Sequence, residues 1–215
     1  MIFLYSGTPG SGKSYHALCD IVDKLRRRTR NGVIANFPVV TENIRRLRGR
    51  FDYWDNSEVS VDRLVQYAVE NHVVGVEGQT LLVLDEAGNL FNAREWQGNR
   101  GRMGWVNFFA QHRKLGYNII LIAQQDRFLD RQIRGCVEYE YSHLKINNAF
   151  GLLPLTAFLC VQRWYGQRLR LGSQIIPYRR SRAKLYDSYA MFAAPGTQPI
   201  TAAAGRGDPP SGGGS

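Results

Sequence analysis

Eight residues near the N-terminus have the types and the spacing of a phosphate-binding loop. Residues 7–14 read GTPGSGKS and match the pattern G-x-x-x-x-G-K-[ST] at each fixed position. In such a loop the glycines let backbone N–H groups turn toward phosphate oxygens, and the lysine bridges the β- and γ-phosphates. The sequence therefore predicts a site for Mg-ATP or Mg-GTP, because the loop reads phosphates and not the base.

The residues expected to bind the nucleotide surround this lysine. They are Gly7, Thr8, Pro9, Gly10, Ser11, Gly12, Lys13, Ser14 and Tyr15. Lys13 is also expected to be catalytic, and the Ser14 hydroxyl is expected to be a ligand of Mg²⁺.

Two acidic residues follow an apolar segment that is typical of a buried strand. Residues 80–84 read TLLVL, and Asp85 and Glu86 come directly after them. A carboxylate at this place holds Mg²⁺ through water in P-loop enzymes, so Asp85 is the second predicted metal ligand. We expect Glu86 to be the general base that takes a proton from the attacking water. A solvated Asp-Glu turn is the alternative.

A second apolar segment, residues 118–123, ends at another polar pair. Gln124 is expected to bond the γ-phosphate or the attacking water, with Gln125 as the alternative if the strand ends one residue later. A polar strand end without a role is the third interpretation. Hydrolysis also needs charge neutralisation, often by an arginine from a neighbouring subunit. The candidates are Arg100, Arg102 and Arg113, with Arg113 taken as the catalytic one.

The elements that must position these residues alternate between strands and helices. Strands are expected at 2–6, 33–37, 80–84 and 118–123, and helices at 13–28, 59–70 and 103–115. This order predicts the α/β fold of a P-loop NTPase, with a mostly parallel central sheet and helices on both faces. A RecA-like (ASCE) strand order is expected, in which the strand before Gln124 lies between the other two. The Gly- and Arg-rich residues 94–104 are expected to be mobile.

The pattern changes in the last third of the chain. Alternating segments such as VEYEYSHLKI indicate antiparallel strands and a hairpin. We therefore expect a P-loop ATPase domain at 1–192, with a nucleotide-binding core at about 1–135 and a basic antiparallel extension at about 136–192. Residues 193–215 are rich in Ala, Gly, Pro and Ser and are expected to form a flexible tail.

The net positive charge of the chain suggests anionic binding partners. The chain has 28 basic and 18 acidic residues, a net charge of +10 and a pI of about 9.8. Basic clusters lie at 24–30, 45–50 and 163–184, and the last also contains Trp164, Tyr165 and Tyr178. Such a cluster could bind single-stranded DNA by charge and stacking, or an anionic membrane surface. A solvated basic face is the alternative.

Cysteine and histidine give no metal-binding pattern in the sequence. The three cysteines, Cys19, Cys136 and Cys160, form no C-x-x-C pair and have no histidine at ligand spacing. They are expected to be reduced, in a cytosolic compartment. His16, His72, His112 and His143 have no matched partners in the sequence and are expected to be structural. No secretory signal is expected, and the longest apolar run, 149–161, is too short to span a bilayer.

With these residues in view, the chain resembles the zonular occludens toxin (Zot) family, the assembly ATPases of filamentous bacteriophages. The resemblance covers most of residues 1–190 and rests on MIFLYSGTPGSGKSYHAL, LLVLDEAGNLF and FFAQHRKLGYNIILIAQQDRFLDRQIRG. The third string discriminates most, because the first two would indicate only the superfamily.

The resemblance implies a cytoplasmic ATPase at the host inner membrane that drives phage assembly and extrusion. It implies a homo-oligomeric ring, contacts with other phage assembly and coat proteins, and a membrane helix that follows this domain in family members and is absent from the sequence given. Two other functions stay open from the residues: a small-molecule kinase, and a nucleotide-gated scaffold with negligible turnover.

Overall fold

The computed structural model describes residues 1–91, 100–147 and 156–186. The expected flexible tail, most of the expected mobile segment and the first part of the apolar run 149–161 lie outside these described residues.

The described residues form one sheet with the strand order β3-β2-β4-β5-β1-β6-β7-β8. In chain order the strands are β1 (Ile2–Ser6), β2 (Gly32–Ala35), β3 (Phe51–Tyr53), β4 (Thr80–Leu84), β5 (Tyr117–Ile122), β6 (Tyr139–Asn147), β7 (Thr156–Trp164) and β8 (Leu169–Pro177). The strands from β3 to β6 in the sheet run parallel, and β7 and β8 are antiparallel to their neighbours. The predicted P-loop NTPase fold is thus confirmed, including β5 between β1 and β4.

The position of β6 differs from the sequence-based expectation. Its residues were expected to open an antiparallel extension, but β6 pairs parallel with β1 and only its other edge is antiparallel, to β7. A short helix, α5 (Arg131–Cys136), makes the crossover that a parallel connection needs. The alternation in β6 reflects a strand that is only partly buried, and burial does not report strand direction.

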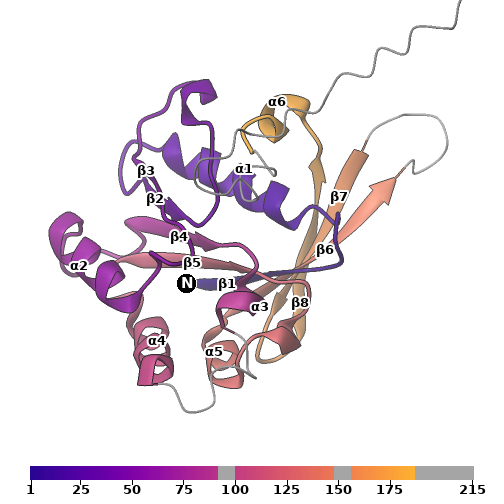
Figure 1. Ribbon diagram of the computed structural model, residues 1–215. Coiled ribbons are helices and arrows are strands. Elements are labelled where there is room, and N and C mark those ends of the chain that lie inside the picture. The colour runs from indigo at the N-terminus through magenta and orange to yellow at the C-terminus, as the bar shows by residue number, and fades with distance from the viewer. Residues whose placement is uncertain (92–99, 148–155, 187–215) are drawn as a thin grey trace, which may run out of the picture.

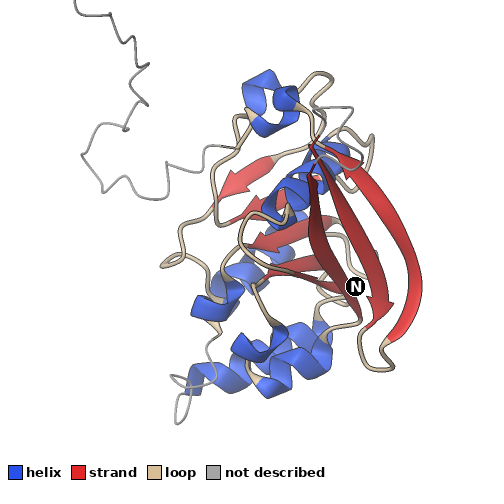
Figure 2. Ribbon diagram, turned by 90° about the vertical axis from the view of Figure 1, so that its right-hand side faces the viewer, coloured by secondary structure: helices blue, strands red, loops and turns tan. Residues whose placement is uncertain are grey.

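Helices cover both faces of the sheet (Figures 1 and 2). The remaining helices are α1 (Lys13–Leu25), η1 (Thr41–Asn43), α2 (Val61–Asn71), α3 (Ala87–Leu90), α4 (Arg100–Gln111), η2 (Asp126–Phe128) and α6 (Arg180–Ala183). Helix α1 lies on one face with α6 beside it, and α2, α4 and α5 lie on the other (Figure 1). Among residues 1–91, 100–147 and 156–186, no helix has the length and apolar composition that crossing a bilayer requires.

Two apolar clusters, one on each face, hold the helices to the sheet. Leu4 and Leu82 point to the α2–α4 side, whereas their strand neighbours Tyr5 and Val83 point to the α1 side. This alternation follows from the two-residue period of a strand, so every core strand is apolar on both faces. The parallel strands are therefore fixed in register, and their carboxyl ends lie along one edge of the sheet.

Candidate nucleotide-binding site

The three predicted site segments meet at the carboxyl edge of the parallel strands. The loop that begins at Gly7 follows β1, Asp85 follows β4, and Gln124 follows β5, which lies between those two strands. The backbone N–H of Gly7 donates to the carbonyl of Gln124 at 3.2 Å. The strand order therefore places the phosphate loop, the acidic pair and the glutamine side by side.

The loop has no space for larger residues at two of its glycines. Gly7 has φ +142°, and a Cβ there would lie 2.6 Å from the carbonyl oxygen of His143 in β6. Gly12 has φ +96°, and a Cβ there would overlap the ring of Phe158 in β7. Gly10 also has a positive φ, +73°, but a Cβ there would meet open space. The loop thus rests directly on β6 and β7.

Lys13 extends back over the loop. Its Nζ donates to the carbonyl oxygens of Gly7 at 2.9 Å and Thr8 at 3.0 Å. Partial burial lowers the pKa of Lys13, and the nearby negative charges of Asp85 and Glu86 act in the opposite direction. The ammonium therefore lies where phosphate oxygens could replace the two carbonyls.

Ser14 and Asp85, the two predicted metal ligands, are in direct contact although they are far apart in the sequence. The Ser14 Oγ donates to Asp85 Oδ2 at 2.7 Å, and the backbone N–H of Glu86 donates to Asp85 Oδ1 at 2.8 Å. Asp85 is buried, which raises its pKa, while the hydrogen bonds and the charge of Lys13 oppose that rise.

Asn36, which follows β2, fixes the backbone of Asp85. Its Oδ1 accepts from the Asp85 N–H at 2.7 Å, and its Nδ2 donates to the Asp85 carbonyl at 2.9 Å and to Asn56 Oδ1 at 2.7 Å. Sequence reasoning missed this residue. The sequence feature that could have revealed Asn36 is a polar side chain at the end of a second buried strand, at the same edge of the sheet as Asp85.

Glu86 and Gln124 line one cavity of about 290 Å³, together with Asn89 and Phe128. Glu86 has a left-handed backbone, with φ 49° and ψ 40°, and its side chain is exposed. Partial burial raises the pKa of Glu86, and the neighbouring charge of Asp85 adds to the rise. A carboxylate of this kind is suited to accept a proton from a water molecule in the cavity. Gln125 is exposed and directly precedes η2.

Tyr186 is a second residue that the sequence did not indicate. It follows α6 and bridges to Val39, and its ring packs edge-on against Phe37 at 5.2 Å between ring centroids. Burial raises the pKa of Tyr186 to about 12, with Asp85 and Glu86 adding to the rise. The chain after β8 therefore returns to the carboxyl edge of the parallel strands.

Arg113, the arginine taken as catalytic, lies away from this site. Arg113 pairs with Glu138, whose other oxygen accepts from the Ile2 N–H at 3.1 Å, so both lie at the amino edge of the sheet. Arg102 pairs with the buried carboxylate of Asp130 at 2.9 Å. The side chain of Arg100 lies outside the described part of the structure.

Tyr15 faces the end of β8 instead of the phosphate loop. Its hydroxyl donates to the Pro177 carbonyl at 3.2 Å and accepts from the Arg179 N–H at 2.8 Å. Its ring packs against Phe158 and Tyr178. The Tyr15 side chain is thus engaged by residues at the end of β8, and only the Tyr15 backbone remains for the expected contact with the nucleotide.

The basic cluster at 163–184 divides into two groups at opposite ends of β8. Arg163 and Arg170 face each other near the β7–β8 turn, beside the exposed Trp164. Arg180 and Arg182 belong to α6, and Arg182 pairs with Asp23 in α1 at 3.2 Å. Because most of the nine-residue strand β8 separates the groups, at roughly 3.3 Å per residue, a single compact ligand does not contact both.

A family model described as "Zonular occludens toxin (Zot)" matches residues 1–192. The Gene 1 protein of Escherichia phage If1 is 30% identical over 138 residues, which are 62% of this chain and 38% of that protein. The Gene 1 protein of Enterobacteria phage fd is 28% identical over 141 residues, 63% of this chain and 39% of that protein. The chain spans about two fifths of the length of these curated relatives.

Solved structures share the fold. The N-terminal domain of zonular occludens toxin from Neisseria meningitidis superposes with a TM-score of 0.56 at 18% identity, covering 86% of this chain and 98% of that chain. The genome packaging NTPase B204 from Sulfolobus turreted icosahedral virus 2, solved with ATP-gammaS, superposes with a TM-score of 0.52 at 14% identity, covering 81% and 96%. At these identities the likeness concerns the fold alone.

Proposed function

The chain belongs to the zonular occludens toxin (Zot) family, and from this premise we propose that it is an ATP-hydrolysing motor domain for the assembly and extrusion of filamentous phage. The observation that carries the proposal is the contact between Ser14 and Asp85, 2.7 Å apart, with the charges of Lys13 and Glu86 close to it. A phosphate loop alone would fit kinases, GTPases and motors alike. The acidic pair beside it favours hydrolysis.

The residues fit Mg-ATP. A serine hydroxyl beside a buried carboxylate offers the hard oxygen donors that Mg²⁺ prefers, so Ser14 and Asp85 would hold the ion, Asp85 through water. A bound Mg²⁺ would supply positive charge against the phosphates. Lys13 would exchange the carbonyls of Gly7 and Thr8 for phosphate oxygens, and loop N–H groups at the start of α1 would complete the cradle. GTP fits the same phosphate contacts.

The proposed hydrolytic step uses the cavity beside the loop. Glu86 accepts a proton from a water molecule there, and the amide of Gln124 orients that water or the γ-phosphate. Because burial and the charge of Asp85 raise the pKa of Glu86, its carboxylate is a stronger base than an ordinary glutamate. Asn36 holds the Asp85–Glu86 backbone in place.

The motor role rests on the relatives. Gene 1 proteins of filamentous phages match this chain, and the packaging NTPase B204 shares its fold. We therefore place the chain at the cytoplasmic face of the host inner membrane, in a homo-oligomeric ring that contacts phage coat and assembly proteins. Arg113 lies at the edge opposite its own nucleotide loop, a position that suits an arginine acting on a neighbour's site. The basic groups near β8 are the proposed contacts for single-stranded DNA.

The test is ATP turnover of the chain against its Glu86→Gln variant. Loss of the general base should lower turnover about 10²- to 10⁴-fold while ATP binding is kept. Glu77→Gln is the matched control, because Glu77 is exposed and precedes the same strand β4 that Glu86 follows. Equal turnover of the wild type and Glu86→Gln would refute the proposed base.

Added ligands separate the remaining possibilities. Single-stranded DNA should stimulate turnover and bind with an affinity that falls steeply with salt; if it does neither, the DNA contact is refuted. A small phosphoacceptor that accelerates loss of ATP would indicate a kinase instead. ATP binding with negligible turnover by the wild type would indicate a nucleotide-gated scaffold.

A further inference from the structure

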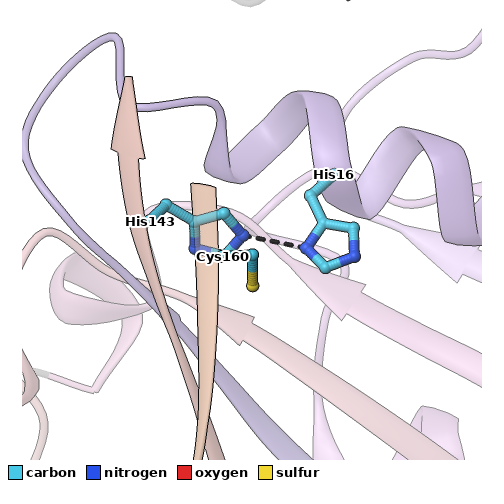
Figure 3. Close-up of side chains that lie close together, drawn as sticks. All are labelled: His16, His143 and Cys160. Atoms are coloured by element: carbon cyan, nitrogen blue, oxygen red, sulfur yellow. Dashed lines mark hydrogen bonds between the residues drawn. The ribbon is translucent and has the colours of Figure 1, made fainter. Parts of the chain in front are cut away.

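Three buried side chains with metal-binding atoms meet behind the phosphate loop. His16 comes from α1, His143 from β6 and Cys160 from β7, and one nitrogen or sulfur from each lies within 4.8 Å of the others (Figure 3). The expectation that no histidine has a metal-binding partner is therefore wrong for His16 and His143. These two are 127 residues apart in the sequence, so no local spacing could reveal the cluster.

The sheet register builds this cluster. His143 lies directly opposite Cys160, and Cys160 lies directly opposite Gln174 in β8. Side chains at paired positions of neighbouring strands share one face, and here that face is covered by the first turns of α1, where His16 lies. The protein core thus brings the three side chains together without any bound ligand.

Hydrogen bonds orient the two imidazole rings so that one nitrogen of His16 faces one nitrogen of His143. His143 Nδ1 lies 3.2 Å from the Ser6 carbonyl oxygen, which can only accept, so Nδ1 carries the proton. The lone pair of His143 Nε2 therefore faces His16 Nδ1, at 2.8 Å. On its far side, His16 Nε2 lies 3.2 Å from the Gln174 amide nitrogen and 3.7 Å from Asp20 Oδ2. Metal-ligating histidines have such a carbonyl or carboxylate behind them, which fixes the ring and its tautomer.

The two histidine rings are removed from water. His16 is 6% exposed and His143 is 1% exposed, and Cys160 is fully buried beside them. Nitrogen and sulfur donors select zinc over magnesium or calcium. The cavity of about 290 Å³ between α1 and β8 is lined by His16, Asp20 and Gln174 and gives an ion a route to the cluster.

We propose that His16 Nδ1, His143 Nε2 and Cys160 Sγ form a zinc site that ties α1 to β6 and β7. On binding, the Cys160 thiol releases its proton to solvent, and the His16 proton moves from Nδ1 to Nε2, where it faces Asp20. A fourth donor comes from solvent or from the Gln174 side chain. Tetrahedral coordination would set the two nitrogens roughly 3.3 Å apart, a shift of about half an ångström from the present 2.8 Å.

The consequence is a clamp beside the nucleotide site. His16 lies two residues after Ser14, and the strands that would share the ion are the ones that carry Phe158 and the His143 carbonyl against Gly12 and Gly7. Bound zinc would thus hold the support of the phosphate loop in place. It would add stability and would take no part in hydrolysis.

The test is a titration of the metal-stripped chain with Co²⁺, in excess Mg²⁺ so that oxygen-rich sites are filled. We expect one Co²⁺ per chain and a thiolate-to-cobalt charge-transfer band in the near ultraviolet. Cys160→Ser should abolish this band, whereas Cys19→Ser and Cys136→Ser, which alter the two cysteines outside the cluster, should keep it. Zn²⁺ at about 100-fold its Kd should raise the Tm of the wild type by about 5–10 °C and that of Cys160→Ser not at all.

The proposal would be overturned by no charge-transfer band in the wild type, by a band that survives in Cys160→Ser, or by a band that is lost with Cys19→Ser instead. The Tm of each stripped variant, measured with a chelator, shows whether the variant still folds. His16→Gln is a second variant that keeps a polar side chain at that place, and it should also bind Co²⁺ far more weakly. Wild-type affinity of His16→Gln would count against the site equally.

Discussion

Asn36 allows a test of how the carboxylate that we propose to bind Mg²⁺ is held in place. In Asn36→Ala, the backbone N–H and carbonyl of Asp85 both lose their partners, which lie at 2.7 Å and 2.9 Å. A buried polar group left without a partner costs about 1–3 kcal/mol. Two such groups, with some relief from entering water, give a loss of about 2–4 kcal/mol in the free energy of unfolding. That is a large share of the total of about 5–15 kcal/mol of a typical domain.

The assay is urea unfolding of the nucleotide-free chain, with ATP turnover measured at a temperature at which the variant stays folded. Because Asp85 and Glu86 would shift together, we expect turnover to fall about 100-fold, the effect of roughly 1 Å of misplacement. Asn56→Ala is the control, since exposed Asn56 only accepts a bond from Asn36 Nδ2 and its loss should cost about 1 kcal/mol or less.

A loss of stability in Asn36→Ala no larger than that in Asn56→Ala would refute the reasoning. So would full turnover in a destabilised Asn36→Ala, because it would show that the Asp85 backbone keeps its position without the amide.

Two further predictions concern the loop and the arginine. Gly12→Ala should lower the free energy of unfolding by about 2 kcal/mol or more and weaken ATP binding, because its Cβ would overlap Phe158. Gly10→Ala, whose Cβ would meet open space, should lower the free energy of unfolding by about 1 kcal/mol. Unfolding and ATP-binding curves measure both effects, and Phe158→Ala should restore the Gly12→Ala protein if the overlap is the cause. Arg113→Ala should lower ATP turnover of the assembled protein about 10³-fold if Arg113 acts on a neighbour's site. Glu138→Gln, which alters the ion-pair partner of Arg113, should leave turnover intact. Equal losses of turnover in both variants would mean that the Arg113–Glu138 pair is only structural.

The local part of the site could be predicted from the sequence. The spacing within residues 7–14 indicates which atoms would face a phosphate, and the uninterrupted apolar run before Asp85 indicates a strand buried on both faces. Neither inference needs distant residues. The position of β5 between β1 and β4 also followed, because the polar pair at Gln124 has a role only if its strand lies beside the loop.

The long-range part could not be predicted. The partnership of Asn36 with Asp85 depends on β2 lying next to β4, and that of His16 with His143 and Cys160 depends on β6 pairing parallel to β1. Alternation along β6 reports burial, and burial is the same for either strand direction. The placement of the Tyr15 side chain is long-range as well, because its neighbours on β8 are set by the sheet and not by the loop motif.

The candidate site is tightly packed where the phosphate loop contacts β6 and β7, and loosely packed around Glu86. At Gly7 and Gly12 the loop touches β6 and β7 so closely that the loop and these strands cannot move independently. On the opposite side, the side chain of Glu86 is exposed beside an open cavity and its backbone is left-handed, a conformation that costs a non-glycine residue about 1 kcal/mol or more. Conformational change on nucleotide turnover is therefore expected at Glu86 and α3, while β6, β7 and the zinc cluster proposed between them keep the phosphate loop in place.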